Sequence, residues 1–309
     1  MSDTILRTDQ LTKRFSKRIL AVDGLDLNIS RNQVFGILGP NGSGKTTTLG
    51  MVLGVVSITK GDYSWFEQGN DNSLRKKIGA ILEQPNFYPF LSASQNLTVH
   101  SRIKDIRKPD TEGLLKLVGL FERRNDPFKT YSLGMKQRLA IASALLADPD
   151  VLIFDEPTNG LDPQGIAEIR KLILDIRDMN KTIILSSHLL DEVQKVCSHF
   201  AVLQRGKKIY SGSVAEALQE TNTIIVSADQ HQPLWDAIQT CPGIQSAENG
   251  NPLIEVTIAE DWSAASLNKF LVERNVRVNY IQQKKSSLEE KFLAILKEND
   301  KKVSADAIR

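Results

Sequence analysis

Short, uninterrupted apolar runs recur through the first two thirds of the chain. Val34–Leu38, Val151–Phe154 and Thr182–Leu185 are three such runs, and longer segments of mixed pattern separate them. Continuous apolar strands are typical of a parallel sheet that is covered on both faces. Strands of this kind that alternate with helical segments predict an α/β domain. We place this domain at residues 1–220.

The pattern changes between Asn86 and Thr130 to polar helical segments with scattered aromatic side chains. A further helical segment then runs to Ala147, and the apolar strands resume only at Val151. We therefore expect a helical subdomain at about residues 86–147, inserted between strands of the sheet.

A second unit is predicted from residue 221 to residue 297. Its order of strand, helix, strand, strand, helix, strand predicts a small α+β domain with a ferredoxin-like topology. Glu248–Gly250 is a turn signal between the two central strands. The expected elements are strands at Thr223–Ser227, Ile244–Ala247, Leu253–Ile258 and Val276–Ile281, and helices at Pro233–Gln239 and Ser263–Glu273.

The last part of the chain contains an amphipathic segment and a polar end. Ser286–Leu296 is expected to be helical, with apolar side chains on one face at Leu288, Phe292, Leu293 and Leu296. Residues 298–309 are predicted to form a disordered polar tail.

Composition narrows the classes of function. The 39 Lys and Arg nearly balance the 37 Asp and Glu, which argues against a dedicated nucleic-acid-binding protein. Cys197 and Cys241 form neither a disulfide framework nor a zinc-binding spacing, which suits a reducing compartment. The N-terminus lacks a signal-peptide pattern, and the longest apolar run, Leu139–Ala147, is shorter than the ~20 residues of a membrane-spanning helix. We expect a soluble chain that reaches a membrane only through a partner.

The segment Gly39–Thr46 matches the phosphate-binding pattern G-x-x-x-x-G-K-[ST] in full. It follows a buried strand and precedes a helical segment, which is the context that the motif requires and that argues against a chance glycine-rich turn. In such a loop the lysine, Lys45, reaches the β- and γ-phosphates, and the hydroxyl of Thr46 binds Mg²⁺. The predicted nucleotide contacts are Gly39, Pro40, Asn41, Gly42, Ser43, Gly44, Lys45, Thr46 and Thr47.

Asp155 and Glu156 end the apolar strand that begins at Val151. Ligands of parallel sheets bind at the carboxyl ends of the strands, so this position suits chemistry. We expect Asp155 to hold Mg²⁺ and Glu156 to polarise the attacking water as the base. A pair of solvated acids, or a helix N-cap, is the alternative for an isolated Asp-Glu pair. The turn Pro157–Pro163 and the phosphate-binding loop favour the catalytic interpretation.

Together these motifs resemble the ATP-binding subunit of an ABC transporter, over residues 4–215. The family has a serine-glycine signature before its second acidic strand, and Tyr131–Arg138 occupies that place. Leu133 and Met135 depart from the common L-S-G-G-Q form, which indicates a subgroup. The resemblance implies that Ser132 and Gly134 contact the γ-phosphate held by a second copy of the chain in an ATP-sandwich dimer; helix capping is the alternative role of Ser132.

The resemblance implies roles for three further residues. His188 resembles the switch histidine that senses the γ-phosphate and orients the water. Phe15 resembles the aromatic residue that stacks on adenine, with a place in the core as the alternative. Asp162 resembles the aspartate that links the two active sites of the dimer.

One loop resembles the segment in which the family has a glutamine that contacts Mg²⁺. Alignment places Glu83 at that position, and Gln84 is the alternative. Both side chains have oxygen atoms that can bind Mg²⁺, but neighbouring side chains of an extended loop point in opposite directions. Glu83, together with the Tyr-Ser-Leu-Gly-Met signature, resembles exporters of bacitracin-type or lantibiotic peptides.

The resemblance also implies partners. Phe87, Tyr88 and Phe90 either belong to the core of the helical subdomain or line a groove for a coupling helix from a membrane subunit. Leu288–Phe292 resembles a C-terminal pattern of the export branch that serves dimer contact or regulation. We thus expect ATP and Mg²⁺ as cofactors, a homodimer, separate integral-membrane permease subunits and a peripheral place on the cytoplasmic face of the cell membrane.

The leading hypothesis is therefore the ATP-hydrolysing motor of an ABC exporter. The alternative is a soluble non-transport ABC-type ATPase of DNA repair, translation or metal-cluster assembly. The long heptad insertions of the repair enzymes and the paired cassettes of the translation factors are not found in this sequence. A third hypothesis is an ATP-binding regulatory module that does not hydrolyse ATP, and Glu156 and His188 argue against it.

Overall fold

The computed structural model describes residues 3–82, 85–218, 220–259, 261–285, 288–289, 291–293 and 295–296. These residues form two compact units. The first comprises the described residues up to Val214 and those from Phe292 onward, and the second spans Ala215–Lys291. Each unit has its own hydrophobic core.

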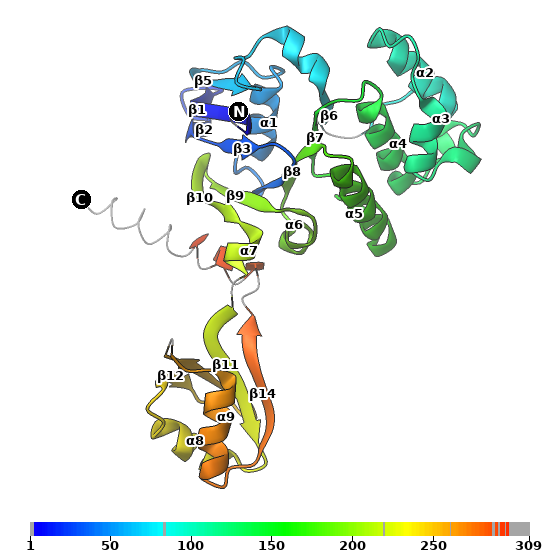
Figure 1. The fold of residues 1–309 in the computed structure, drawn as a ribbon. Coiled ribbons are helices and arrows are strands. Elements are labelled where there is room, and N and C mark those ends of the chain that lie inside the picture. The colour runs from blue at the N-terminus through cyan, green and yellow to red at the C-terminus, as the bar shows by residue number, and fades with distance from the viewer. Residues whose placement is uncertain are drawn as a thin grey trace. The chain divides into compact units, whose positions relative to one another are not determined.

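The first unit is built around a six-stranded sheet in the order β10-β9-β4-β8-β7-β6 (Figure 1). Neighbouring strands are parallel, except that β10 and β9 are antiparallel. Every residue of β4, β7 and β8 is buried, which explains why these strands are continuous apolar runs in the sequence. The strands are β4 (Val34–Leu38), β6 (Ile78–Ile81), β7 (Val151–Asp155), β8 (Thr182–Ser187), β9 (His199–Gln204) and β10 (Lys207–Ser213).

A second sheet of this unit is antiparallel, and the sequence analysis did not predict it. Its strand β1 pairs with each of the other three strands. Helix α1 (Lys45–Val52) shares one hydrophobic core with residues of both sheets. The indole N–H of Trp65 donates a 2.8 Å hydrogen bond to the carbonyl of Val52, which ties the antiparallel sheet to this helix. The strands are β1 (Thr4–Arg14), β2 (Leu20–Leu25), β3 (Asn28–Ser30) and β5 (Lys60–Trp65).

Three α-helices lie between β6 and β7 in the chain: α2 (Ala93–Ile103), α3 (Thr111–Leu117) and α4 (Leu133–Leu145). They lie beside one another, away from β1, β2 and β5 (Figure 1). The other helices and 3₁₀ turns are α5 (Pro163–Asp178), α6 (Leu190–Val196), α7 (Val214–Ala217), η1 (Asn72–Lys77), η2 (Phe121–Arg123) and η3 (Phe128–Thr130).

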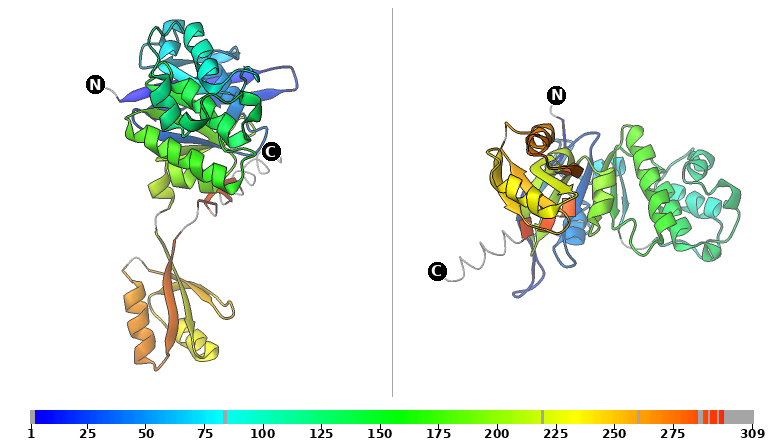
Figure 2. Two further views of the ribbon diagram at one scale, coloured as in Figure 1. Left: turned by 90° about the vertical axis from the view of Figure 1, so that its right-hand side faces the viewer. Right: turned by 90° about the horizontal axis from the view of Figure 1, so that it is seen from below.

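The second unit has a four-stranded antiparallel sheet in the order β12-β13-β11-β14, with β11 and β14 as its longest strands (Figure 2). Alternate residues of β13 are buried, because the two helices contribute to a core on one face of the sheet. The elements are β11 (Glu220–Ala228), α8 (His231–Gln239), β12 (Ile244–Glu248), β13 (Ile254–Ile258), α9 (Ala264–Glu273) and β14 (Val278–Lys285).

Some expectations fall on positions outside the described residues. Glu83 and Gln84 lie there, as does the predicted tail at 298–309. The predicted helix Ser286–Leu296 is described only in part, and its described positions from Leu288 onward are helical. Within the described ranges, no helix combines the length and the apolar character that crossing a bilayer requires.

Candidate functional site

The phosphate-binding loop connects β4 to α1. Gly42 and Gly44 have φ angles of +78° and +106°, which lie in the left-handed region that glycine tolerates. A Cβ atom on Gly44 would also lie 2.6 Å from the carbonyl oxygen of Ala21. Gly44 caps α1 without a side-chain hydrogen bond. The loop thus leaves a helix N-terminus open to an anion.

Lys45, the first residue of α1, is buried, and its ammonium group lies among oxygen atoms. It donates hydrogen bonds to the carbonyls of Gly39, at 2.8 Å, and Pro40, at 3.3 Å. Its Nζ atom is also 3.2 Å from Oε1 of Glu156. The predicted phosphate-binding lysine and the predicted base are therefore direct neighbours.

The backbone at the end of β7 orients the two predicted acids differently. Asp155 is buried, and its carboxylate accepts a short hydrogen bond from the hydroxyl of Ser186. The same hydroxyl accepts a 2.9 Å hydrogen bond from the backbone N–H of Glu156. Glu156 has a φ angle of +50°, a conformation that is costly for a residue with a side chain and that is common at functional sites. Ser186, which the sequence analysis did not select, stabilises this turn.

His188 completes a continuous set of contacts around Glu156. Its Nδ1 atom is 2.7 Å from Oε2 of Glu156, and its ring is more exposed than that carboxylate. The hydroxyl of Ser187 accepts a 2.9 Å hydrogen bond from the N–H of Leu189, which closes the turn that carries the imidazole. Lys45 therefore contacts one oxygen of the Glu156 carboxylate, and His188 contacts the other.

A pocket of about 520 Å³ brings most of the predicted nucleotide contacts together. Phe15 lines it and is 56% exposed, so Phe15 is not a core side chain. The sequence analysis missed Ile19, Leu20 and Ala21, because these residues contribute aliphatic or backbone surface and belong to no motif. It also did not select Asn159, which lies within the quoted turn Pro157–Pro163. The lining consists of Phe15, Ile19, Leu20, Ala21, Asn41, Gly42, Ser43, Gly44, Lys45, Thr46, Thr47, Glu156, Asn159 and His188.

The signature residues lie in a separate hollow of about 450 Å³ between the N-terminal ends of α4 and α5. Ser132 caps α4 through a 3.3 Å hydrogen bond from the N–H of Met135, so its capping role is real. Asp162 caps α5 through a 2.8 Å hydrogen bond from the N–H of Gly165. Gly134 lines the same hollow. Within one chain, the structure therefore does not bring these residues to the phosphate-binding loop.

The described residues fit a magnesium–nucleotide complex but not a metal site made of protein ligands alone. Across the described ranges, no group of three His, Cys, Asp or Glu side chains could hold a metal ion. The hydroxyl of Thr46 and the carboxylate of Asp155 are hard oxygen donors of the kind that binds Mg²⁺ together with phosphate oxygens. The buried hydroxyl of Ser43 lines the same pocket and has no hydrogen-bond partner within the described protein.

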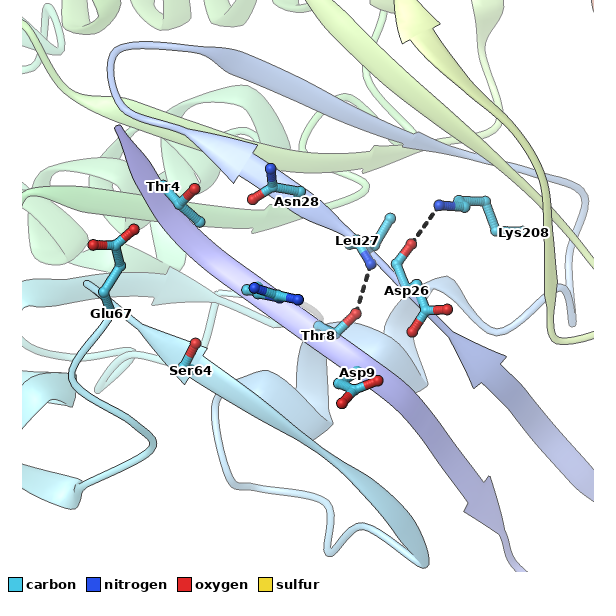
Figure 3. A pocket seen from close by; sticks show the side chains of 10 residues that line it. Thr4, Thr8, Asp9, Asp26, Leu27, Asn28, Ser64, Glu67 and Lys208 are labelled. Atoms are coloured by element: carbon cyan, nitrogen blue, oxygen red, sulfur yellow. Dashed lines mark hydrogen bonds between the residues drawn. The ribbon is translucent and has the colours of Figure 1, made fainter. Parts of the chain in front are cut away.

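A larger hollow of about 790 Å³ lies on the antiparallel sheet (Figure 3), and none of its lining residues is a predicted site residue. Its lining mixes both signs of charge, as at Asp9 and Lys208. The hydroxyl of Thr8 already bonds to the backbone of Leu25 and Leu27, and Lys208 donates to the carbonyl of Asp26. These internal hydrogen bonds leave this hollow without a converging set of ligand-binding groups.

The aromatic residues after the Glu83 position divide into two groups. Phe87 is buried and stacks on the ring of His100 with 4.8 Å between ring centroids. Tyr88 and Phe90 are 48% and 71% exposed. Core packing therefore accounts for Phe87, while Tyr88 and Phe90 form an exposed aromatic pair.

Burial shifts the pKa of several groups outside the pocket. It is the main cause that lowers the pKa of His100, whose Nδ1 atom is 2.7 Å from the hydroxyl of Ser143 on α4. Burial also lowers the pKa of Lys104. It raises the pKa of the Cys197 thiol well above its ordinary range. That thiol packs against β4, because a Cβ atom on Gly36 would lie 3.1 Å from Cys197 Sγ.

The comparisons with known proteins agree with this geometry. Residues 22–159 match the family model described as ABC transporter. YhcH of Bacillus subtilis (strain 168), an uncharacterized ABC transporter ATP-binding protein, is 38% identical over 306 residues, which cover 97% of this chain and 98% of the relative. The bacitracin transport ATP-binding protein BcrA of Bacillus licheniformis is 34% identical over 309 residues, which cover 95% and 97%.

Shorter proteins match as well. The lantibiotic transport ATP-binding protein SrtF of Streptococcus pyogenes is 39% identical over 222 residues, which cover 70% of this chain and 95% of the relative. Among solved structures, CbiO1 of Clostridium perfringens, part of the ABC transporter complex CbiONQ, superposes with a TM-score of 0.63 and 31% identity. That match covers 70% of this chain and 90% of the other.

The phosphate-binding loop, the acidic strand end and these matches define a P-loop ATPase of the ATP-binding cassette type, and the chain belongs to the ABC transporter ATP-binding proteins. It binds ATP and is an ATPase, as the sequence predicted. It is the ATP-binding motor subunit of a membrane ABC transporter of the branch that contains BcrA and SrtF.

Proposed function

We propose that this chain drives the export of a peptide-like molecule, with Glu156 as the base that activates water for ATP hydrolysis. One observation carries the catalytic part of the proposal. Lys45 and His188 contact the two oxygens of Glu156 at the floor of the nucleotide pocket. A base needs a position next to the γ-phosphate and a partner that orients the water, and this arrangement supplies both.

Each residue has a distinct task in the proposed reaction. The N–H groups of the loop and Lys45 bind the phosphates and stabilise the charge that develops as the γ-phosphate leaves. In the ATP-bound state, Lys45 exchanges its contact with Glu156 for phosphate oxygens, which frees the carboxylate to accept a proton from water. His188 holds the water and the γ-phosphate in line, and Phe15 stacks on the adenine.

Thr46 and Asp155 would hold Mg²⁺ together with the nucleotide, and Glu83 or Gln84 is proposed as a further ligand. When bound, the metal neutralises phosphate charge and orients the β- and γ-phosphates. The hydrogen bond from Ser186 fixes the carboxylate of Asp155 before the nucleotide arrives.

A homodimer is proposed because the two hollows of one chain are complementary. The first contains the phosphate-binding loop and Glu156, and the second contains Ser132, Gly134 and Asp162. Two chains placed head to tail would close each nucleotide between the first hollow of one copy and the second hollow of the other. ATP then favours the closed dimer, since it contacts both copies, and hydrolysis removes these contacts.

The membrane partner is proposed to contact the exposed aromatic pair Tyr88 and Phe90. These side chains follow the predicted Mg²⁺-contacting positions within a few residues of the sequence, so we propose that a coupling helix bound to them would sense the nucleotide state. The names of BcrA and SrtF support a peptide antibiotic as the transported class. The chain would then sit peripherally on the cytoplasmic face of the cell membrane, beside separate permease subunits.

Two domain assignments are part of the same proposal. We assign α2, α3 and α4 to the inserted helical subdomain that receives the permease. The second unit is assigned as a ferredoxin-like domain, on the basis of its element order and its β12-β13-β11-β14 sheet. Its role is regulation or dimer contact rather than catalysis, because SrtF is a transport ATP-binding protein that matches this chain over 222 residues only.

The partner is tested by co-purification. A tagged Glu156→Gln chain is expected to retain ATP, and membranes from the source cell, solubilised gently with ATP present, should yield a polytopic membrane protein in comparable amount. Tyr88→Ser with Phe90→Ser should lose this protein. Ile103→Ser, which removes a 75% exposed apolar side chain of the same three-helix region, should keep it. Soluble partners alone would favour the non-transport class of ABC-type ATPase.

A further inference from the structure

One ion pair joins the two helices that follow the active-site loops. Arg170 on α5 donates from Nη2 to Oε1 of Glu192 at 2.6 Å and from Nε to Oε2 at 3.3 Å. Glu192 lies on α6, and its side chain is only 10% exposed. Two parallel hydrogen bonds fix both the distance and the relative orientation of the two groups. The carboxylate of Glu192 is also the main cause that raises the pKa of Arg170.

Helix α5 connects this pair to the hollow that contains the signature residues. The helix begins at Asp162, whose carboxylate caps it, and Arg170 lies about two turns further along. Its buried residues Ile169, Leu172 and Ile173 pack it into the core, so it moves as one element. A displacement of the Asp162 end is therefore transmitted to Arg170.

Helix α6 connects the pair to the catalytic histidine. The helix starts two residues after His188, and Glu192 lies in its first turn. The intervening turn is closed by the hydrogen bond from the N–H of Leu189 to the hydroxyl of Ser187. This turn is short and internally bonded, which favours the transmission of a shift at Glu192 to the imidazole of His188.

A small cavity of about 10 Å³ adds a third connection. Its lining includes Glu192, Ile173 of α5 and the residues Pro157 and Thr158. Pro157 directly follows Glu156, whose left-handed backbone already requires support. The ion pair thus lies where the helix of Asp162, the helix after His188 and the turn after Glu156 meet.

Neighbouring ion pairs on the same helices provide a contrast. Lys195 and Asp191 on α6 are 43% and 67% exposed, and Arg177 and Asp178 on α5 are 44% and 66% exposed. Exposed pairs of this kind contribute little, because water and salt screen them. Arg170 and Glu192 are 26% and 10% exposed, so water screens this pair less than the exposed pairs, and loss of one partner leaves a partly buried charge without compensation.

We propose that the Arg170–Glu192 ion pair positions His188 against Glu156 and couples that position to the Asp162 end of α5. Both residues are positioning residues, since neither lines the nucleotide pocket. The proposal rests on the catalytic role proposed above for His188. In the dimer, closure onto Asp162 moves α5, and the ion pair carries this movement to the imidazole.

The test compares Glu192→Gln, which has nearly the same shape but no charge, with Lys195→Met as the control on the same helix. Glu192→Gln is expected to lower kcat for ATP hydrolysis by about ten- to a hundredfold, as misplacement of a catalytic group does. The KM for ATP should stay within about twofold, because the phosphate-binding loop is intact. Lys195→Met should leave kcat and KM unchanged.

A double-mutant cycle separates positioning from general damage to the fold. In a His188→Ala chain, Glu192→Gln should change kcat by no more than about twofold, because the group that it positions is missing. An equal fall of kcat in both backgrounds would overturn the proposal. An unchanged kcat in Glu192→Gln alone would also overturn the positioning proposal. In either case, a lowered kcat in His188→Ala would still support the catalytic role proposed for His188.

A second pair of substitutions guards against unfolding. Arg170→Met with Glu192→Leu replaces the ion pair with apolar side chains, an exchange that proteins often tolerate without loss of stability. A reduced kcat at an unchanged melting temperature supports positioning, and full activity contradicts it. If His188→Ala itself retained full activity, the proposed catalytic role of His188 would fail, and the positioning proposal with it.

Discussion

The two hollows of the first unit differ in how complete they are within one chain. The hollow that contains the phosphate-binding loop has Lys45, Glu156 and His188 already in contact, and it presents an open helix N-terminus. The hollow that contains the signature has capped helices and a glycine with space above it, but neither a lysine nor a histidine among its lining residues.

This difference leads to the proposal that assembly switches the ATPase. The first hollow contains the phosphate-binding loop, and the second contains the signature residues. In the proposed homodimer, turnover would depend on a partner copy that covers the first hollow with its own second hollow. The predictions below test this proposed pairing of the two hollows between copies.

The largest effect is expected from substitution of Glu156, the proposed base. Glu156→Gln should lower kcat for ATP hydrolysis by about 10²- to 10⁴-fold, because the amide cannot accept a proton from water. ATP affinity should be unchanged, as measured by equilibrium binding. Glu112→Gln, at a first-turn position of α3 remote from both hollows, is the matched control. Retention of most of the activity would refute the assignment of Glu156.

A nearly equal effect is expected from the second hollow. Gly134→Asp should abolish turnover, with a loss of about a hundredfold or more, because a carboxylate facing the partner's phosphates costs several kcal/mol. The chain should still fold, since the nearest atoms to a Cβ at this glycine lie 3.9 Å away. ATP binding to the monomer should persist, and Gly134→Ala should behave like the parent in the same assay.

Mixing these two inactive proteins sharpens the comparison. A mixed dimer of Glu156→Gln and Gly134→Asp chains pairs one intact first hollow with one intact second hollow. ATPase activity should therefore appear on mixing, measured against each protein alone. Two hollows that act within a single chain would give no recovery.

A smaller effect is expected from the adenine end of the pocket. Phe15→Ala should weaken ATP binding by about three- to tenfold, which corresponds to the loss of one aromatic contact. Phe15→Tyr keeps the ring and should keep the affinity. Equal ATP affinity of the parent, Phe15→Ala and Phe15→Tyr in a titration would refute the stacking role of Phe15.

The smallest effect concerns His100 on α2, which contacts Ser143 on α4, the helix that follows the signature serine. Burial, and then the charge of Lys104, lower the pKa of His100 below its ordinary 6.5. The unfolded chain binds this proton more readily, so stability should be complete above pH 6.5 and decline as the pH falls toward the lowered pKa. His100→Gln should show a weaker decline in the free energy of unfolding between pH 7 and pH 5, measured by urea unfolding beside the parent.

Sequence patterns predicted elements where one physical signal dominates. β4 and β7 were found because strands buried on both faces are almost continuously apolar, with Asp155 at the end of β7 as the exception. The antiparallel sheet was missed because β1 carries register shifts toward all three of its partners, which break the alternation of buried and exposed positions. In the second unit, β13 at Ile254–Ile258 differs from the expected Leu253–Ile258 by a single residue.

The candidate site shows the same limit. Lys45, Glu156 and His188 follow buried strands within recognisable motifs, so their convergence was expected. Ser186 and the pair Arg170–Glu192 were missed, because their importance arises from hydrogen bonds over 22 to 31 positions of the chain. Such contacts depend on how α5, α6 and β8 pack together, and no local pattern encodes that packing.

The burial of both cysteines makes selective labelling of an added surface cysteine possible. Cys197 and Cys241 are the only thiols of the chain, both are buried, and burial raises the pKa of each. Thiolate is the form that reacts with maleimides and spin labels, so the native sulfurs should react slowly in the folded protein. A single surface cysteine placed near either hollow should therefore accept a probe selectively, and distances between two labelled copies would report directly on the approach of the chains during turnover.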